Sequence, residues 1–411
     1  MSDISAQSAP AGVFRTQQRL SPRMRFYLLA SITLSFLAGS SVPTPIYPIY
    51  QSEWHFSPVT ITYIFSVYSL SVLVALLVVG RLSDYIGRRP VLLVATLAQM
   101  LAMYLMGTAD GLGDLIDGRV LQGLSTGAAV SAVGAGLIDI DRQRGAVANA
   151  IAPVSGSALG ALVGSVLVQF LPFPTHTVFA VLGAIFIAQF AGLLLIRDTV
   201  TARSGMLRSL IPQFAVPAQV RGAMLVASAV FVAGWALAGF YASLGPALIR
   251  TVFGLPASLM GGVALAVFSG SGVVAILALR TRTARELSWA GSAGLLTGMA
   301  LSLASLHAQS VTVFFCGVAL AGAGFGTGFQ GGIRLVVAKA LAHQLTGVLS
   351  VAFVCCYLGM GAPAIAAGYA VASGIDIIAT AQVFGSLVIM LALLAMFGLV
   401  MSRPALASEP V

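Results

Sequence analysis

Apolar residues in this chain occur in long, unbroken runs and not in short alternating segments. Each run is about twenty residues long, which is the length of helix that crosses the hydrocarbon core of a bilayer. A helix also satisfies its own backbone hydrogen bonds there, whereas a membrane barrel would alternate apolar and polar positions. The pattern predicts twelve spanning helices, at residues 26–47, 59–79, 90–108, 112–136, 146–170, 177–196, 223–248, 257–279, 290–308, 311–337, 347–371 and 377–400.

The composition supports an all-α membrane protein. Only 8% of the 411 residues are charged and 58% are hydrophobic, whereas about 25% of the residues of a soluble protein are charged. A net charge of +9 could indicate nucleic-acid binding. The basic residues, however, lie in short loops beside the apolar runs, so membrane topology explains them better and no nucleic-acid partner is expected.

The distribution of basic residues predicts the orientation. Cytoplasmic loops of membrane proteins are rich in Lys and Arg. If the N-terminus is cytoplasmic, all but three of the 21 Lys and Arg residues lie on that side. The exceptions are Arg250 in an outer loop, and Arg119 and Arg334 within spans. Both termini are therefore expected in the cytoplasm of a multi-pass protein of the bacterial inner membrane.

The longest loop between spans divides the chain into two equal halves. We expect a cytoplasmic tail without a cleavable signal peptide, a six-helix bundle, a basic central loop with an amphipathic stretch at 206–216, a second six-helix bundle and a short tail. Small residues at 160–165 and 362–367 resemble each other and suggest an internal repeat. The predicted segments are 1–25, 26–197, 198–222, 223–402 and 403–411.

A cluster of charges and glycines lies between the second and third spans. It comprises Gly80, Asp84, Gly87, Arg88 and Arg89. The glycines allow a sharp turn and a close approach of helix ends, and Asp84 is a short anion that can accept a hydrogen bond from Arg88. A simple basic anchor would explain the two arginines but neither Asp84 nor the spaced glycines.

This loop resembles the signature loop of the Major Facilitator Superfamily, a family of membrane transporters. Gly80, Leu82, Asp84, Gly87, Arg88 and Arg89 match its pattern, at the expected place in a chain of twelve spans. The prolines of 42–48 are expected to form a rigid outer turn that ends the first span. Together with the segment 54–58, this turn looks like the outer lip of a bacterial drug-exporter-like branch of the family. The resemblance implies two pseudo-symmetric bundles, alternating access, and a loop that acts as a gating latch.

Arg119 lies within the fourth span, where a buried arginine needs a partner or a water-filled cavity. Arg119, Gln122 and Gly123 match the family's fourth-span pattern, which implies a role in proton coupling or substrate handling. A structural arginine bonded to backbone carbonyls is the alternative. Asp117 and Asp114 share one face of this helix, and each is either a proton carrier or an inert residue at the outer interface.

Other polar and small residues carry weaker expectations. In the family, the first, fourth, seventh and tenth spans line the cavity, so the candidates here include Ser35, Trp235, Tyr241 and Gln330, each of which could instead pack helices. The fifth span resembles the family's antiporter motif, but Ala161 replaces its proline and Ser165 its last glycine. The residues expected to support close helix packing are Gly156, Gly160, Gly164 and Pro363.

These features favour a secondary active transporter of a small organic solute, with proton-coupled efflux expected. The alternatives are a metabolite uptake carrier on the same fold and a transport-inactive sensor or scaffold. No phosphate-binding Gly-x-x-x-x-Gly-Lys-Ser/Thr loop is present, so ATP-driven transport is not expected. As a transporter, the protein is not expected to be an enzyme. We expect no cofactor and no metal site, with protons and membrane lipid as further partners of a monomer.

Overall fold

The computed structural model describes residues 20–198, 200–201 and 203–401. The predicted tails, 1–25 and 403–411, therefore lie largely or wholly outside the described part. Within it the chain is helical without strands, and twelve helices are long and apolar enough to cross a membrane. This confirms the predicted all-α fold of twelve spans. The helices are α1 Pro22–Ser41, α2 Tyr47–Trp54, α3 Pro58–Val79, α4 Ser83–Ile86, α5 Arg88–Gly107, α6 Leu112–Ile140, α7 Arg142–Phe170, α8 Pro174–Leu194, α9 Met206–Ser209, α10 Ala218–Ser243, α11 Gly245–Phe253, α12 Ala257–Ala278, α13 Ala284–Ala308, α14 Val311–Val337, α15 Leu345–Ala372 and α16 Ile377–Met401, with 3-10 turns η1 Thr44–Ile46 and η2 Ala342–Gln344.

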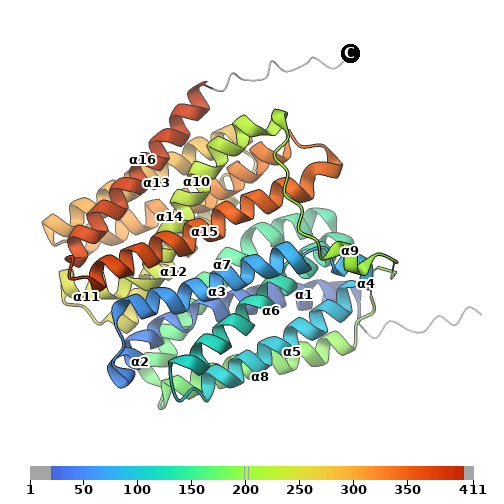
Figure 1. Cartoon of the computed structure of the whole chain (residues 1–411), viewed down its shortest axis with the longest axis horizontal. Coiled ribbons are helices and arrows are strands. Elements are labelled where there is room, and N and C mark those ends of the chain that lie inside the picture. The colour runs from blue at the N-terminus through green and yellow to red at the C-terminus, as the bar shows by residue number, and fades with distance from the viewer. Residues whose placement is uncertain (1–19, 199, 202, 402–411) are drawn as a thin grey trace, which may run out of the picture.

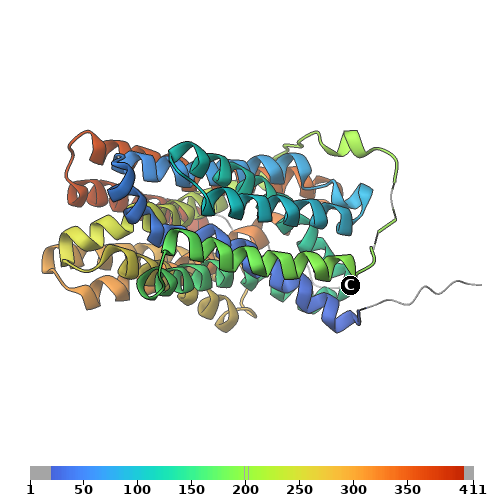
Figure 2. The same cartoon turned by 90° about the horizontal axis from the view of Figure 1, so that it is seen from below.

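The helices form two bundles side by side, α1–α8 and α10–α16, joined by a segment that contains α9 (Figure 1). The long helices run roughly parallel to one another along the longest axis of the molecule (Figure 2). Across the boundary, α7 packs against α12 and α3 packs against α15. The short helices α4 and α9 lie at one end of the bundles, and α2 and α11 lie at the other. We call these the α4 end and the α2 end.

The first and seventh spans continue beyond their predicted ends. The prolines of 42–48 were expected to form a non-helical turn, but the chain passes through η1 into α2. Likewise, α10 is followed directly by α11. Pro45, Pro48 and Pro246 each occupy the first turn of a helical segment, where a missing N–H costs nothing. Helix α1 thus ends at Ser41, just before Pro43, while the later prolines begin new helical segments.

Some helices also begin earlier than the apolar pattern predicts. Helix α7 starts at Arg142, whereas the fifth span was predicted from residue 146. The reason is that the Asp141 side chain accepts a hydrogen bond from the Arg144 N–H at 2.9 Å and caps the helix. In the central segment, only Met206–Ser209 of the predicted amphipathic stretch is helical.

Helices α1 and α7 approach closely along a ridge of three glycines. A Cβ at Gly156 would lie 2.6 Å from Leu34 O, and one at Gly164 would lie 2.9 Å from Val42 O. At Gly160, between them, a Cβ would lie 2.6 Å from Ala38 Cα. Backbone contact at three successive turns explains why small residues recur here at i, i+4 spacing.

Candidate functional site

A central cavity of about 140 Å³ lies between the two bundles. Helices α1, α3 and α7 of the first bundle and α10, α12, α14 and α15 of the second contribute its walls. None of its lining residues is charged. The aromatic ones are Phe65, Tyr68, Trp235, Phe268, Phe325, Phe329 and Tyr357, and the polar aliphatic ones are Ser40, Ser41, Asn149, Ser157 and Ser269.

A second pocket of about 430 Å³ lies at the α4 end, between α7, α12 and α14. Its polar lining comprises Gln143, Arg280, Thr281, Gln330 and Arg334. Ala150 lines both this pocket and the central cavity. The second pocket is therefore adjacent to the cavity on the side of the α4 end.

At the α2 end the two bundles are in close backbone contact. A Cβ at Gly262 of α12 would overlap the hydroxyl of Ser165 and lie 2.7 Å from Ala161 O, both on α7. On the other side of the boundary, a Cβ at Gly368 of α15 would lie 2.7 Å from Thr62 Cγ2 on α3. The space between the bundles is thus narrow at the α2 end and wider at the α4 end.

Trp235 is the aromatic centre of the second bundle's wall. Its ring lies 4.9 Å from that of Tyr357, 5.9 Å from that of Phe329 and 6.0 Å from that of Phe325, measured between centroids. The indole Nε1 is buried and has no hydrogen-bond partner among the described residues. An indole N–H can only donate, so this donor is left unsatisfied within the described part of the chain.

Arg119 lies directly behind the first bundle's wall and is completely buried. Its Nη1 donates to the backbone oxygen of Ser40 at 3.3 Å and to Gln122 Oε1 at 2.5 Å. Its guanidinium carbon lies 4.3 Å from the centre of the Tyr68 ring, within the range of a cation–π interaction. Gln122 in turn donates to Gly39 O at 2.9 Å. The polar residues of α6 are thereby connected to α1 and α3, which carry the cavity wall.

The charge of Arg119 has no carboxylate partner among the described residues. Nε and Nη2 are buried without a hydrogen-bond acceptor. Asp117, which the sequence offers as a proton carrier, is exposed near the α2 end of α6 and makes no ion pair within the described chain. The structure thus brings Arg119 and Gln122 together but does not bring Asp117 to them.

The four cavity candidates from the sequence lie in different places. Trp235 lines the cavity, and Gln330 lines the second pocket. Ser35 is buried inside the first bundle, where it donates to Gln189 Oε1 at 2.9 Å. Tyr241 is buried inside the second bundle, with its hydroxyl 3.4 Å from that of Ser302. A hydrophobic period marks a buried face but does not distinguish a bundle core from a cavity wall.

Several wall residues were missed because the family pattern directs attention to other spans. Tyr68 and Phe65 come from the second span, Asn149 from the fifth, Phe268 from the eighth and Tyr357 from the eleventh. No residue of α6 lines the cavity, since Ser40 and Tyr68 stand in front of Arg119. The sequence signal that could have identified these wall residues is their aromatic character, because seven aromatic residues line the central cavity.

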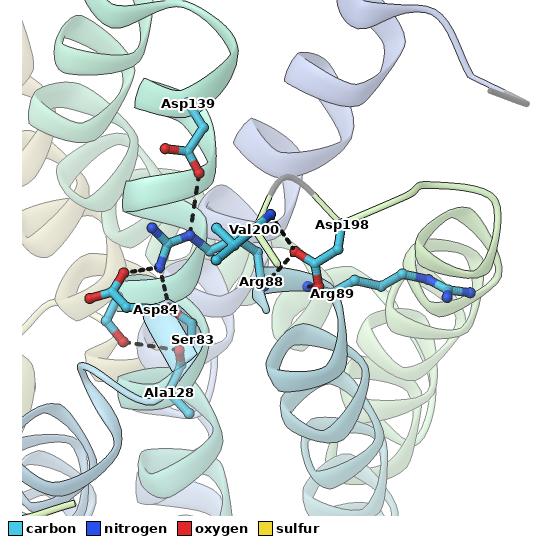
Figure 3. A network of polar contacts seen from close by, with 9 residues as sticks. Ser83, Asp84, Arg88, Arg89, Ala128, Asp139, Asp198 and Val200 are labelled. Carbon is cyan, nitrogen blue, oxygen red and sulfur yellow. Dashed lines mark hydrogen bonds and ion pairs between the residues drawn. The ribbon is translucent and has the colours of Figure 1, made fainter. Parts of the chain in front are cut away.

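The charged loop between α3 and α5 forms a network within the first bundle (Figure 3). Arg88 is its centre: it pairs with Asp84, donates to Ser83 Oγ at 2.7 Å, and contacts Asp139 at 3.3 Å. Arg89 donates to the carbonyls of Leu193 and Leu194, both at 3.0 Å. The loop thereby joins the ends of α5, α6 and α8.

Asp198, just after α8, caps the start of α5 and was not singled out in the sequence. Its carboxylate accepts the backbone N–H of Arg88 at 2.8 Å and that of Arg89 at 3.1 Å. The central segment also contacts the loop, since the Arg203 N–H donates to Tyr85 O at 2.8 Å. These described polar contacts of the loop stay within the first bundle and the central segment.

Comparison with known proteins gives a consistent result. A family model described as Major Facilitator Superfamily matches residues 29–364. The chain is 28% identical over 333 residues to proteins named Multidrug resistance protein MdtL from Salmonella heidelberg (strain SL476) and Salmonella typhimurium (strain LT2), with 74% of this chain and 79% of each relative covered.

Solved structures with the same fold are also transporters. A mutant of the nucleoside transporter NupG superposes with a TM-score of 0.70 at 11% identity, covering 92% of this chain and all of that one. A bacterial homologue of the human lysosomal transporter Spinster, in an inward-facing and occupied conformation, gives 0.70 at 14% identity, with 91% and 96% covered. At such low identity these two structures support the fold and not the substrate.

Proposed function

Because this chain belongs to the Major Facilitator Superfamily and is a transporter rather than an enzyme, we propose that it exports a small organic solute across the bacterial inner membrane by alternating access. The observation that carries the proposal is the cavity between the bundles, which is bounded by close contacts at the α2 end and adjoins a larger pocket at the α4 end. Alternating access requires such a central site with one end closed.

We assign the α4 end to the cytoplasm. The charged loop and the basic central segment both lie there, and basic loops favour the cytoplasmic side. With this orientation the conformation is inward-facing, and the solute enters the cavity through the pocket lined by Gln143, Arg280 and Arg334.

In this proposal the charged loop is a gating latch that acts in the other conformation. Its residues Gly80, Asp84, Gly87, Arg88 and Arg89 would meet the second bundle when the cytoplasmic side closes. In the present conformation their described polar contacts remain on the first bundle's side, which is the arrangement expected of a disengaged latch.

Export is favoured by the name of the relatives, which are called multidrug resistance proteins. Uptake is kept as a second candidate because Ala161 stands where the antiporter motif has proline.

We propose that protons drive the transport. Asp117 is the described acid nearest to Arg119 in sequence and is the candidate proton carrier.

The test uses purified protein reconstituted in vesicles with an imposed pH gradient. Proton-coupled export predicts that solute and protons move in opposite directions and that a protonophore stops solute movement. Co-directional movement would indicate uptake by symport instead. Movement unaffected by the protonophore would contradict proton coupling, and Asp117→Asn should lower the coupled flux if that residue carries the proton.

A further inference from the structure

The charges around the central cavity all have one sign. Arg119 is completely buried behind one wall, and the second pocket, on the proposed entry path, is lined by Arg280 and Arg334. No Asp or Glu lines either space, and every acidic residue in the described part of the chain is exposed or half-buried. A solute in the cavity therefore experiences a positive potential.

The potential of Arg119 reaches the cavity because only one layer of atoms separates them. Both of the groups that it contacts on that side, the Ser40 backbone and the Tyr68 ring, belong to residues of the wall. Two of its nitrogens have no acceptor among the described residues. Across one layer of atoms, the charge of Arg119 acts strongly on a solute in the cavity, because the surroundings have a low dielectric constant.

The opposite wall is aromatic. The Trp235 ring lines the cavity and stands among Tyr357, Phe325 and Phe329. Its buried Nε1 has no hydrogen-bond partner among the described residues. This wall fits a solute with a flat apolar body.

Aromatic rings can also bind organic cations through their faces, so the two classes must be distinguished. Here the Tyr68 face is already occupied by Arg119. An entering cation would pass Arg280 and Arg334 and then approach Arg119, with no carboxylate on the lining to compensate. Like charges brought together without compensation are disfavoured, which argues against a cationic solute.

We propose that the transported solute is an aromatic organic anion of the carboxylate class, held with its ring against the Trp235 wall and its charge toward Arg119. This inference rests on the proposed transport function, which it narrows to one class of substrate. It assigns Arg119 to charge selection and Trp235 to ring contact.

The test compares three probes with the same ring: 2-naphthoate, 2-naphthamide and protonated 2-naphthylmethylamine. Binding to the full-length protein in nanodiscs is measured at equilibrium without any ion gradient. We expect the carboxylate to bind at least about tenfold more tightly than the ammonium, which corresponds to one modest charge interaction. Equal binding, tighter binding of the ammonium, or no saturable binding of the carboxylate would overturn the proposal.

Variants identify the residues that are responsible for the preference for the carboxylate probe. Arg119→Gln should remove the preference of carboxylate over amide, whereas Arg119→Lys should keep part of it because the charge is retained. A purely structural arginine would change binding of both probes equally. Trp235→Ala, which removes the aromatic contact, should weaken binding of the carboxylate and the amide alike, because both probes carry the same ring. Arg208→Gln, in the exposed central segment, is the charge-matched control and should change neither.

Binding and flux separate this inference from the proposed function. If the carboxylate preference is found but no gradient moves the probe in vesicles, the transport proposal fails while the ligand class stands. If vesicles move the ammonium in preference to the carboxylate, the transport function stands and the inferred substrate class is wrong.

Discussion

Gly87 and Asp198 fit together so closely that a side chain at position 87 would overlap the Asp198 carboxylate. Gly87 has φ 102° and ψ 157°, a conformation that only glycine adopts readily. A Cβ there would overlap the Asp198 carboxylate and lie 2.6 Å from its Cγ. The same carboxylate accepts the first two N–H groups of α5. Position 87 of the charged loop must therefore be glycine because of Asp198, which lies 111 positions later in the chain.

Gly87→Ala should destabilise the protein through both backbone strain and this overlap. Strain alone costs about 1–3 kcal/mol. Gly374→Ala is the matched control, because Gly374 also has positive φ, 91°, but has nothing within 4 Å of its Cβ position. Thermal unfolding in detergent should show a larger fall for Gly87→Ala. Adding Asp198→Ala should recover part of that difference; equal falls for the two glycines would contradict the account.

Asp84→Asn should lower transport at least about tenfold while the protein still folds and reaches the membrane. Asp84 is half-exposed and pairs with Arg88, and exposed ion pairs contribute at most about 1 kcal/mol to stability. Its effect is therefore expected on conformational change and not on folding. Transport and membrane abundance should be measured together, with Asp110→Asn as an exposed control at the α2 end. Undiminished transport by Asp84→Asn would refute the latch.

The fold could be predicted from the sequence because membrane helices are recognisable by the length and hydropathy of their segments. All twelve spans follow from that signal. Helix ends were less accurate where polar residues extend a helix, as at α7, where the Asp141 cap adds a turn that an apolar window excludes. Loop motifs were recognisable because Asp84, Arg88 and two glycines are close together in the chain.

The cavity was predicted less well because its walls depend on how the bundles meet. Ser35 and Tyr241 lie on plausible helices yet face bundle interiors. Asp198 could not be identified as the cap of α5, since nothing local links it to a helix more than a hundred residues earlier. Long-range pairings of this kind follow from packing, which one sequence does not reveal.

Gly160→Ala should destabilise the first bundle, whereas Gly183→Ala should not. The added methyl at Gly160 would overlap the Ala38 backbone on α1, while Gly183, in the middle of α8, has nothing within 4 Å. Overpacking costs about 1–3 kcal/mol, but alanine is favoured over glycine in a helix by about 1 kcal/mol. The two variants should therefore shift the unfolding temperature in opposite directions. A shift of the same sign in both would argue against close α1–α7 packing.

A cross-link across the second pocket should stop transport. Gln143 on α7 and Thr281, just after α12, both line this pocket, and in alternating access they approach each other when the α4 end closes. The experiment needs a background without Cys316, Cys355 and Cys356, which are free thiols.

In that background, Gln143→Cys with Thr281→Cys should react with a short bifunctional reagent that forms a disulfide with each thiol, lose transport, and regain it after reduction of those disulfides. The two single-cysteine variants, treated identically, control for simple blockage of the pocket by the reagent. Alternating access predicts that the cross-linked protein is held closed at the α4 end, so solute added on that side should no longer reach Trp235 or change its fluorescence. Full transport by the cross-linked pair would show that closure of this pocket is not part of the cycle.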